Sequence, residues 1–236
     1  MPKHEKKILE TISQEKHDYG PVSPRDFPHL DLTFYHRGGQ ELEQLGFLSL
    51  GDWENLTLSR ASIGGRTTFI RLAVSRDGLV VTALYHAKPR LVLRLILSVL
   101  GRQTTFKVCD FETEYSDGSF LVTTNSNAAS TLRIPQAMIV DNRPHSTAIA
   151  TLSGLHRQRM NAYTGLVPPI RPTTYGNADD VLASQHRQQA LRAAYWKQIR
   201  GISREELAEL SRRRDNLASQ IQAALNGTSA PTTTSQ

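Results

Sequence analysis

Cysteine is nearly absent from this sequence, since Cys109 is the only one in 236 residues. A single cysteine excludes an intramolecular disulfide and a cysteine-based zinc cluster, and it is typical of a reducing compartment. The residues from Met1 to Lys7 are charged and lead into no apolar core of the signal-peptide type. We therefore expect a cytoplasmic protein, with Cys109 as a small core residue.

Long apolar runs and familiar catalytic motifs are missing as well. No run approaches the roughly 20 apolar residues of a transmembrane helix. The chain has no glycine-rich nucleotide loop, no GxSxG nucleophile elbow and no SxxK motif. Its histidines do not have the HxH or HxxxH spacing of a local metal site. We therefore expect no cofactor and favour a protein that is not an enzyme.

Positive charge is what the sequence has in excess. Lys and Arg number 28 against 22 Asp and Glu, which gives a formal net charge of +6. Such an excess favours acidic partners, namely nucleic acid, an anionic membrane surface or an acidic protein. The hydrophobic content of 39% is ordinary for a globular protein, so we expect a folded core.

Two Asp-Gly turns give the clearest fold signal. Asp77-Gly78 and Asp117-Gly118 each separate two runs rich in β-branched and aromatic residues, which is the signature of a β-hairpin. The runs are 67–75 with 79–87 and 104–115 with 119–125, and shorter strands are predicted at 56–62 and 131–134. The pattern predicts an α+β fold in which an antiparallel sheet of four to five strands packs on helices.

Helix signals lie before and after these strands. Helices are predicted at 3–16, 33–45, 146–163 and 179–200, with another beginning at Ser203. Asp31 or Thr33 is the predicted N-cap of the helix over 33–45, and Gly46 is its predicted C′ residue. Ser203 and Glu206 form a capping box, so the last two helices are predicted as a C-terminal helical pair.

The segment from Leu91 to Leu100 has two interpretations. As a strand, it would place alternate leucines on one face. As a helix, it would place the arginines at 90, 94 and 102 in one narrow polar stripe, bounded by Pro89 and Gly101. We favour the helix, which would be buried or would dock on a partner.

Composition divides the chain into five parts. Prolines and glycines cluster at 164–178, which predicts a linker. The predicted parts are an N-terminal helix with an irregular lead-in (1–32), an α+β core domain (33–163), the linker (164–178), the C-terminal helical pair (179–225) and a disordered tail (226–236).

An acidic strand is the first candidate site. Asp110, Glu112 and Glu114 have the same parity, so they share one strand face about 7 Å apart, and they are candidate metal ligands. His86 lies at the end of a neighbouring strand and can serve as a general base with Asp110 and Glu112 as its catalytic partners. The alternative is a solvated strand face, with Cys109, Phe111 and Tyr115 pointing into the core.

The C-terminal helices are the second candidate. Positive residues gather on one side of the helix over 179–200 and just beyond it, which suits an anionic partner; they are Arg192, Lys197, Arg200 and Arg204. The alternative is a helix that packs on the domain and leaves its basic face solvated. The next helix carries a narrow apolar stripe suited to helix pairing, formed by Leu207, Leu210, Leu217 and Ile221.

Two stretches carry a resemblance. Residues 45–54 (LGFLSLGDWE) and 110–125 (DFETEYSDGSFLVTTN) resemble segments of uncharacterised bacterial proteins, over about residues 30–165. The resemblance implies a bacterial origin and carries no activity, cofactor or catalytic residue.

These features rank three functions. The first is a non-enzymatic binding or regulatory module that contacts a protein partner, or a second copy of itself, through the C-terminal helices. The second is a small metal-dependent hydrolase whose site lies at the acidic strand end. The third is a peripheral nucleic-acid or anionic-membrane binder that uses the basic helix.

Overall fold

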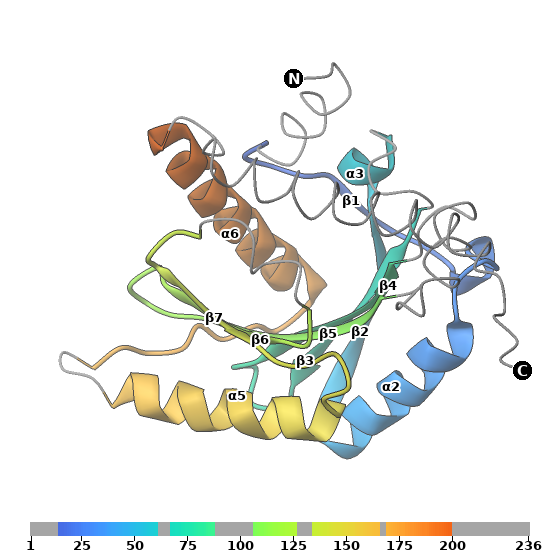
Figure 1. Cartoon of the computed structure of the whole chain (residues 1–236), viewed down its shortest axis with the longest axis horizontal. Helices are drawn as coiled ribbons and strands as arrows, with labels where there is room; N and C mark the ends of the chain where they lie inside the picture. The colour runs from blue at the N-terminus through green and yellow to red at the C-terminus, as the bar shows by residue number, and fades with distance from the viewer. Residues whose placement is uncertain (1–13, 61–66, 88–105, 127–133, 166–168, 200–236) are drawn as a thin grey trace, which may run out of the picture.

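The computed structural model describes residues 14–60, 67–87, 106–126, 134–165 and 169–199, and these residues form one sheet covered by helices on both faces (Figure 1). The strands are β1 (Tyr19–Pro21), β2 (Phe47–Asn55), β3 (Phe69–Ser75), β4 (Val81–Ala87), β5 (Phe106–Glu114), β6 (Phe120–Thr124) and β7 (Met138–Asn142). The helices are α2 (Leu32–Gln44), α3 (Leu56–Arg60), α5 (Ile149–Thr164) and α6 (Ala178–Gln198), with a 3₁₀ turn, η1, at Pro24–Asp26.

The sheet has seven strands in the order β1 to β7, so each strand lies beside its neighbour in sequence. All pairs are antiparallel except β6 and β7, which are parallel. The α+β class and the antiparallel sheet are thus confirmed, but the expected four to five strands are too few. The strands β1, β2 and β7 were missed because two are short and β2 is interrupted by a register shift between Ser49 and Gly51.

Both predicted hairpins are present. β3 pairs with β4 and β5 pairs with β6, each across its Asp-Gly turn. Gly78 and Gly118 have φ values of 70° and 80°, which glycine adopts without the steric cost that a Cβ adds. Asp31 caps α2 by accepting from Phe34 N at 3.1 Å, and Gly46, just beyond α2, has a φ of 87°.

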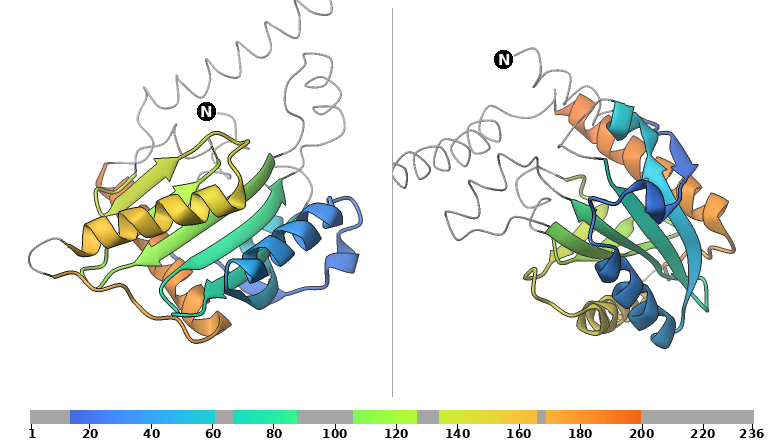
Figure 2. Two further views of the ribbon diagram at one scale, coloured as in Figure 1. Left: turned by 90° about the horizontal axis from the view of Figure 1, so that it is seen from below. Right: turned by 90° about the vertical axis from the view of Figure 1, so that its right-hand side faces the viewer.

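The two faces of the sheet are covered differently. α2 and α5 lie on one face and α6 crosses the other, as the views in Figures 1 and 2 agree. The main core forms between the sheet and the α2–α5 layer, with Tyr35, Leu84, Phe111 and Leu152 almost fully buried. Cys109 belongs to this core and is buried, as expected.

His156 attaches α5 to the sheet. The Thr113 hydroxyl donates to Leu79 O at 2.9 Å, so it accepts a hydrogen bond from His156 Nε2 at 3.0 Å. The Thr123 hydroxyl then donates to His156 Nδ1, also at 3.0 Å. Burial, helped by Arg157 and Arg159, lowers the pKa of this imidazole to about 3, so it is held neutral in the core.

One other expectation fails. The predicted strand over 56–62 begins as helix α3, whose start Asn55 supports by accepting from Leu58 N at 3.0 Å. Part of the predicted linker is attached to the sheet, because Thr173 N donates to Glu114 O and Tyr175 N donates to Gly78 O, each at 2.8 Å. The side chain of Tyr175 is buried, so α6 does not start from a free connection.

Several expectations fall outside the described residues. These are the segment from Leu91 to Leu100, the helix beginning at Ser203 and the tail. Most of the helix predicted over 3–16 and three of the four residues of the strand predicted over 131–134 also lie outside. Of the predicted C-terminal pair, only the first helix is therefore described, and it packs on the sheet. Within the described ranges, no helix is both long enough and apolar enough to cross a membrane.

Gly78 provides a test of this packing. A Cβ at Gly78 would lie 2.8 Å from Tyr175 O, whereas a Cβ at Gly118 would meet nothing within 4 Å. We expect Gly118→Ala to lower the free energy of unfolding by about 1 kcal/mol, from its positive φ alone. Gly78→Ala should cost at least ~1 kcal/mol more, because the Tyr175 backbone must also move. Urea denaturation of both variants checks this, and equal losses would contradict the close approach of residue 175.

Candidate functional site

The acidic row of β5 lies beneath α6. Asp110 pairs with Ala83 and Glu112 with Val81 on β4, and these side chains face α6, away from the main core. Glu112 and Glu114 both make hydrogen bonds with α6 side chains. The structure therefore places the helix over 178–198 on the acidic strand, with one of the four basic candidates, Arg192, directed toward it. The expectation of a solvated acidic face is not met, because α6 covers it.

Glu114 has the most complete set of partners. Arg187 donates to both of its carboxylate oxygens, from Nε at 2.6 Å and Nη2 at 2.7 Å. Ser184 donates to Oε2 at 2.7 Å and itself contacts the Tyr175 hydroxyl, which accepts from Glu114 N. The Glu114 side chain is 7% exposed, so this ion pair is shielded on the carboxylate side. We call this set, Glu114, Tyr175, Ser184 and Arg187, the α6 clamp.

Glu112 binds the middle of the same helix. Gln185 Nε2 and Gln188 Nε2 donate to Oε2 at 2.6 and 3.2 Å. Burial raises the pKa of Glu112, while the positive charge of Arg192 and the two amides lower it. Side-chain amides therefore replace water as the hydrogen-bond donors to this carboxylate.

Asp110 is less completely satisfied. Tyr85 donates to Oδ2 at 3.1 Å, but the buried Oδ1 atom has no hydrogen-bond partner among the described residues. Burial, helped by the neighbouring Glu112 charge, raises the pKa of Asp110 to about 7, against the lowering effects of Thr124, Tyr85 and Arg192. Thr124 is close enough to act on this pKa but does not meet hydrogen-bond geometry with Oδ1. An unpaired buried acceptor is uncommon in native proteins, and it marks Asp110 as a candidate ligand contact.

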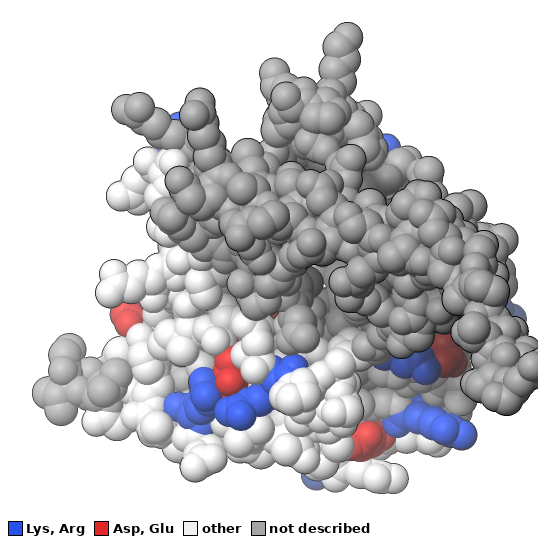
Figure 3. All heavy atoms as spheres, viewed as in Figure 1, with Lys and Arg blue, Asp and Glu red and all other residues white. Residues whose placement is uncertain are grey.

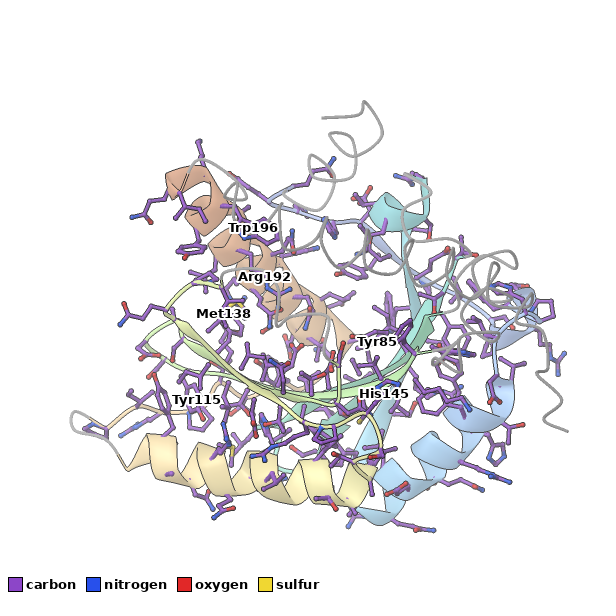
Figure 4. All side chains as sticks on the ribbon, in the orientation of Figure 1. Tyr85, Tyr115, Met138, His145, Arg192 and Trp196 are labelled. Atoms are coloured by element: carbon purple, nitrogen blue, oxygen red, sulfur yellow. The ribbon has the colours of Figure 1, made fainter. Side chains whose placement is uncertain are left out.

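Arg192 extends from α6 toward the sheet, over Met138 of β7 (Figure 4). Its Nε donates to Met138 Sδ at 3.4 Å, and its positive charge lowers the pKa of both Asp110 and Glu112. Within the described part of the chain, it forms no ion pair with an acidic side chain. We call Tyr85, Asp110, Glu112 and Arg192 the interlayer site.

His86 is not part of this site. It pairs with Lys107 in the register of β4 and β5, so it faces α2, on the side of the sheet opposite Asp110 and Glu112. There it is 2% exposed, and its Nδ1 accepts from Asp31 N at 2.9 Å. The structure thus does not bring His86 together with the acidic row. The alternation of strand side chains decides this: once the register is known, even residues of β4 and of β5 face opposite sides.

A metal centre made of Asp110, Glu112 and Glu114 finds no support in the geometry. Among the described residues, no group of three His, Cys, Asp or Glu side chains is arranged to hold a metal ion. Two of the three carboxylates already accept hydrogen bonds from Arg187, Ser184 or glutamine amides. These donors face the oxygens that a cation would need.

The predicted anion-binding residues are divided. Arg192 faces the sheet and Lys197 is exposed near the end of α6, while Arg200 and Arg204 lie outside the described residues. The described residues carry 14 Lys and Arg against 16 Asp and Glu, so the positive excess belongs to the other segments. On the face in Figure 3, the described basic side chains lie in small groups beside acidic ones. The apolar stripe of Leu207, Leu210, Leu217 and Ile221 is also outside the described residues.

Several site residues were missed from the sequence. Tyr85, Tyr175, Ser184, Gln185 and Gln188 each bind an acidic residue of β5 or another member of the clamp. The signal was present on α6, where Val181, Ser184, Gln188 and Arg192 recur at three- and four-residue spacing and so share one helix face. Three of its four members are polar, so the pattern resembles a solvated helix face.

Comparisons of the chain with models of protein families, with curated proteins and with solved structures found no match. The site is therefore interpreted from its own geometry.

The pKa of Asp110 gives a test. Its folded value of about 7 lies above the unfolded value of 3.8, so the folded protein holds a proton that the unfolded chain releases. The stability that this proton confers is present below pH 3.8 and is lost as the pH rises through 7. We therefore expect the free energy of unfolding of Asp110→Asn to rise relative to that of the natural protein as the pH increases from 5 to 8, by on the order of a few kcal/mol.

Urea denaturation across this pH range measures the difference. Asp117→Asn is the control, because Ser119 lowers the pKa of this exposed carboxyl and its titration is complete below pH 5. Its stability difference from the natural protein should therefore stay constant from pH 5 to 8. An equally constant difference for Asp110→Asn would show that Asp110 is not a buried carboxyl.

Proposed function

We propose that this protein is a binding module that holds a small polar ligand between α6 and the sheet, at the interlayer site. The observation that carries the proposal is the buried Oδ1 of Asp110, which has no hydrogen-bond partner in the described part of the chain although Tyr85 donates to the other oxygen. Leaving such an acceptor unsatisfied costs about 1–3 kcal/mol, and a ligand that donates to it recovers that cost.

The neighbouring groups define the ligand. Asp110 Oδ1 needs a hydrogen-bond donor, and the Arg192 guanidinium has N–H groups with no oxygen partner among the described residues. A molecule with a donor and an acceptor close together, such as a primary amide, satisfies both. A purely anionic ligand is disfavoured, because it would meet the charges of Glu112 and Asp110.

A second candidate is acid–base chemistry at the same carboxyl. A pKa of about 7 makes Asp110 able both to accept and to release a proton near neutral pH, and Tyr85 fixes its orientation. This candidate replaces His86 with Asp110 as the base in the predicted enzyme, and it requires no metal.

The partner contacts expected of a regulatory module remain a prediction. They depend on Leu207, Leu210, Leu217 and Ile221, and the basic contacts to nucleic acid or membrane depend on Arg200 and Arg204 together with Lys197. The α6 clamp supports this prediction in one respect, because it fixes α6 on the sheet and the chain continues from α6 into residues 200–236.

Benzamide and N,N-dimethylbenzamide test the binding proposal. Both offer an acceptor to Arg192, but only benzamide can donate to Asp110 Oδ1. We expect benzamide to bind with a Kd of a few mM, as is usual for a fragment of this size, and the dimethyl compound to bind at least fivefold more weakly. Titration followed by protein NMR measures both affinities.

Two variants of α6 serve as a matched pair. Arg192→Met removes the guanidinium facing the sheet and should weaken benzamide binding at least fivefold, while Lys197→Met removes an exposed charge and should leave it unchanged. Equal affinity for the two amides, equal effects of the two variants, or no binding of benzamide would each reject the interlayer site as a site for such a ligand.

A further inference from the structure

A groove lies on the other side of α6 from the clamp, where the helix meets the N-terminal part of the fold. It has a volume of about 350 Å³ and is lined by residues 16–19, Leu56, Arg60, Leu182 and His186. The right-hand view of Figure 2 shows β1, α3 and α6 side by side at this place. The groove shares no residue with the interlayer site.

The floor of the groove is apolar and aromatic. Leu56 comes from α3 and Leu182 from α6, and Tyr19 of β1 stands beside them. The Tyr19 ring lies 6.0 Å from the His186 ring, centroid to centroid, and tilted by 42°. These surfaces suit a flat apolar or aromatic body.

The floor is also held in place. His186 Nε2 donates to His17 O at 2.8 Å, and His17 is 5% exposed. Asp18 N donates to Thr57 Oγ1 at 2.8 Å, which links the segment before β1 to α3. The three walls are thus connected by hydrogen bonds before any ligand arrives, so little ordering is needed on binding.

The rim of the groove is positive. Lys16 forms no ion pair within the described residues, and Arg60 pairs only with Asp18, at 3.0 Å. That pair is exposed, at 69% for Arg60 and 60% for Asp18, so it contributes little and can yield to another anion. Lys16 and Arg60 together outnumber the single carboxylate, although the described residues as a whole carry slightly more acidic than basic residues.

We infer that this groove binds a small organic anion with a flat apolar body, whose acidic group lies at Lys16 and Arg60 and whose body lies on Tyr19, Leu56 and Leu182. The ligand would touch three elements at once. Its binding therefore adds to the attachment of α6 at the end where the helix begins, opposite the end from which residues 200–236 continue.

Two probes that share one ring system test the inference. 2-Naphthoate carries a carboxylate, and 2-naphthylmethylammonium carries a positive charge on a similar body. We expect 2-naphthoate to bind the full-length protein with a Kd of about 1 mM, from the usual affinity per atom of small ligands. The ammonium compound should bind at least tenfold more weakly. NMR titration that follows the His17 and His186 rings reports the affinity and locates it.

Variants separate the rim from the floor. Lys16→Glu should weaken 2-naphthoate binding at least fivefold, and Leu182→Trp should abolish binding by filling the groove. Lys197→Glu makes the same charge change at the exposed end of α6 and should alter binding less than twofold. The circular dichroism spectrum and melting temperature of each variant establish that it is folded before titration.

The inference is overturned if 2-naphthoate fails to bind, if the two probes bind equally, or if Lys16→Glu and Lys197→Glu have the same effect. It is also overturned if 2-naphthoate binds but the His17 and His186 signals do not respond. None of these outcomes bears on benzamide binding at the interlayer site, so the two proposals stand or fall separately.

Discussion

The ion pair between Glu114 and Arg187 determines how the second layer of this protein is built. It joins the last residue of β5 to the middle of α6 through two parallel N–H···O contacts, and Ser184 and Tyr175 complete the hydrogen bonds of the carboxylate. A carboxylate this deeply buried is costly without such partners. Glu114 therefore needs Arg187, whose own side chain is 51% exposed, and the pair fixes where α6 crosses this end of β5.

Both proposed sites depend on that position. With α6 in place, Gln185 and Gln188 bind Glu112, and Arg192 comes to lie above the sheet near Asp110. The opposite side of the same helix closes the groove with Leu182 and His186. The two faces differ in kind: α2 and α5 are held by the main apolar core and by the neutral His156, whereas α6 combines charge and amide contacts with two smaller apolar clusters that include Val181 and Leu191.

The features of local origin could be predicted from the sequence. The Asp-Gly turns, the Asp31 cap, the position of Cys109 in the core and the α+β class each depend on a few adjacent residues. The separation of His86 from Asp110 depends on strand register, and the cover over the acidic strand depends on where α6 returns after a long connection. These are contacts between distant parts of the chain, and patterns of charge and periodicity do not specify them.

The packed face of α6 is the clearest example of a feature that the sequence alone does not predict. The packed side of α6 carries Ser184, Gln188 and Arg192, so the helix has little apolar asymmetry and its pattern predicts that this polar side faces solvent. The same reasoning predicts solvated carboxylates on β5. The polar side of α6 and the carboxylates of β5 are explained only when the helix and the strand are placed against each other, because the donors of the helix then meet the acceptors of the strand.

A double-mutant cycle on Glu114 and Arg187 tests this account most directly. The unfolding free energies of Glu114→Gln, Arg187→Met and the double variant are measured by urea denaturation at pH 7. If the pair fixes α6 on the sheet, the two changes are strongly coupled, with an interaction free energy of about 2 kcal/mol. Additive effects, within about 0.5 kcal/mol, would show that α6 is held by other means and that the central claim is wrong.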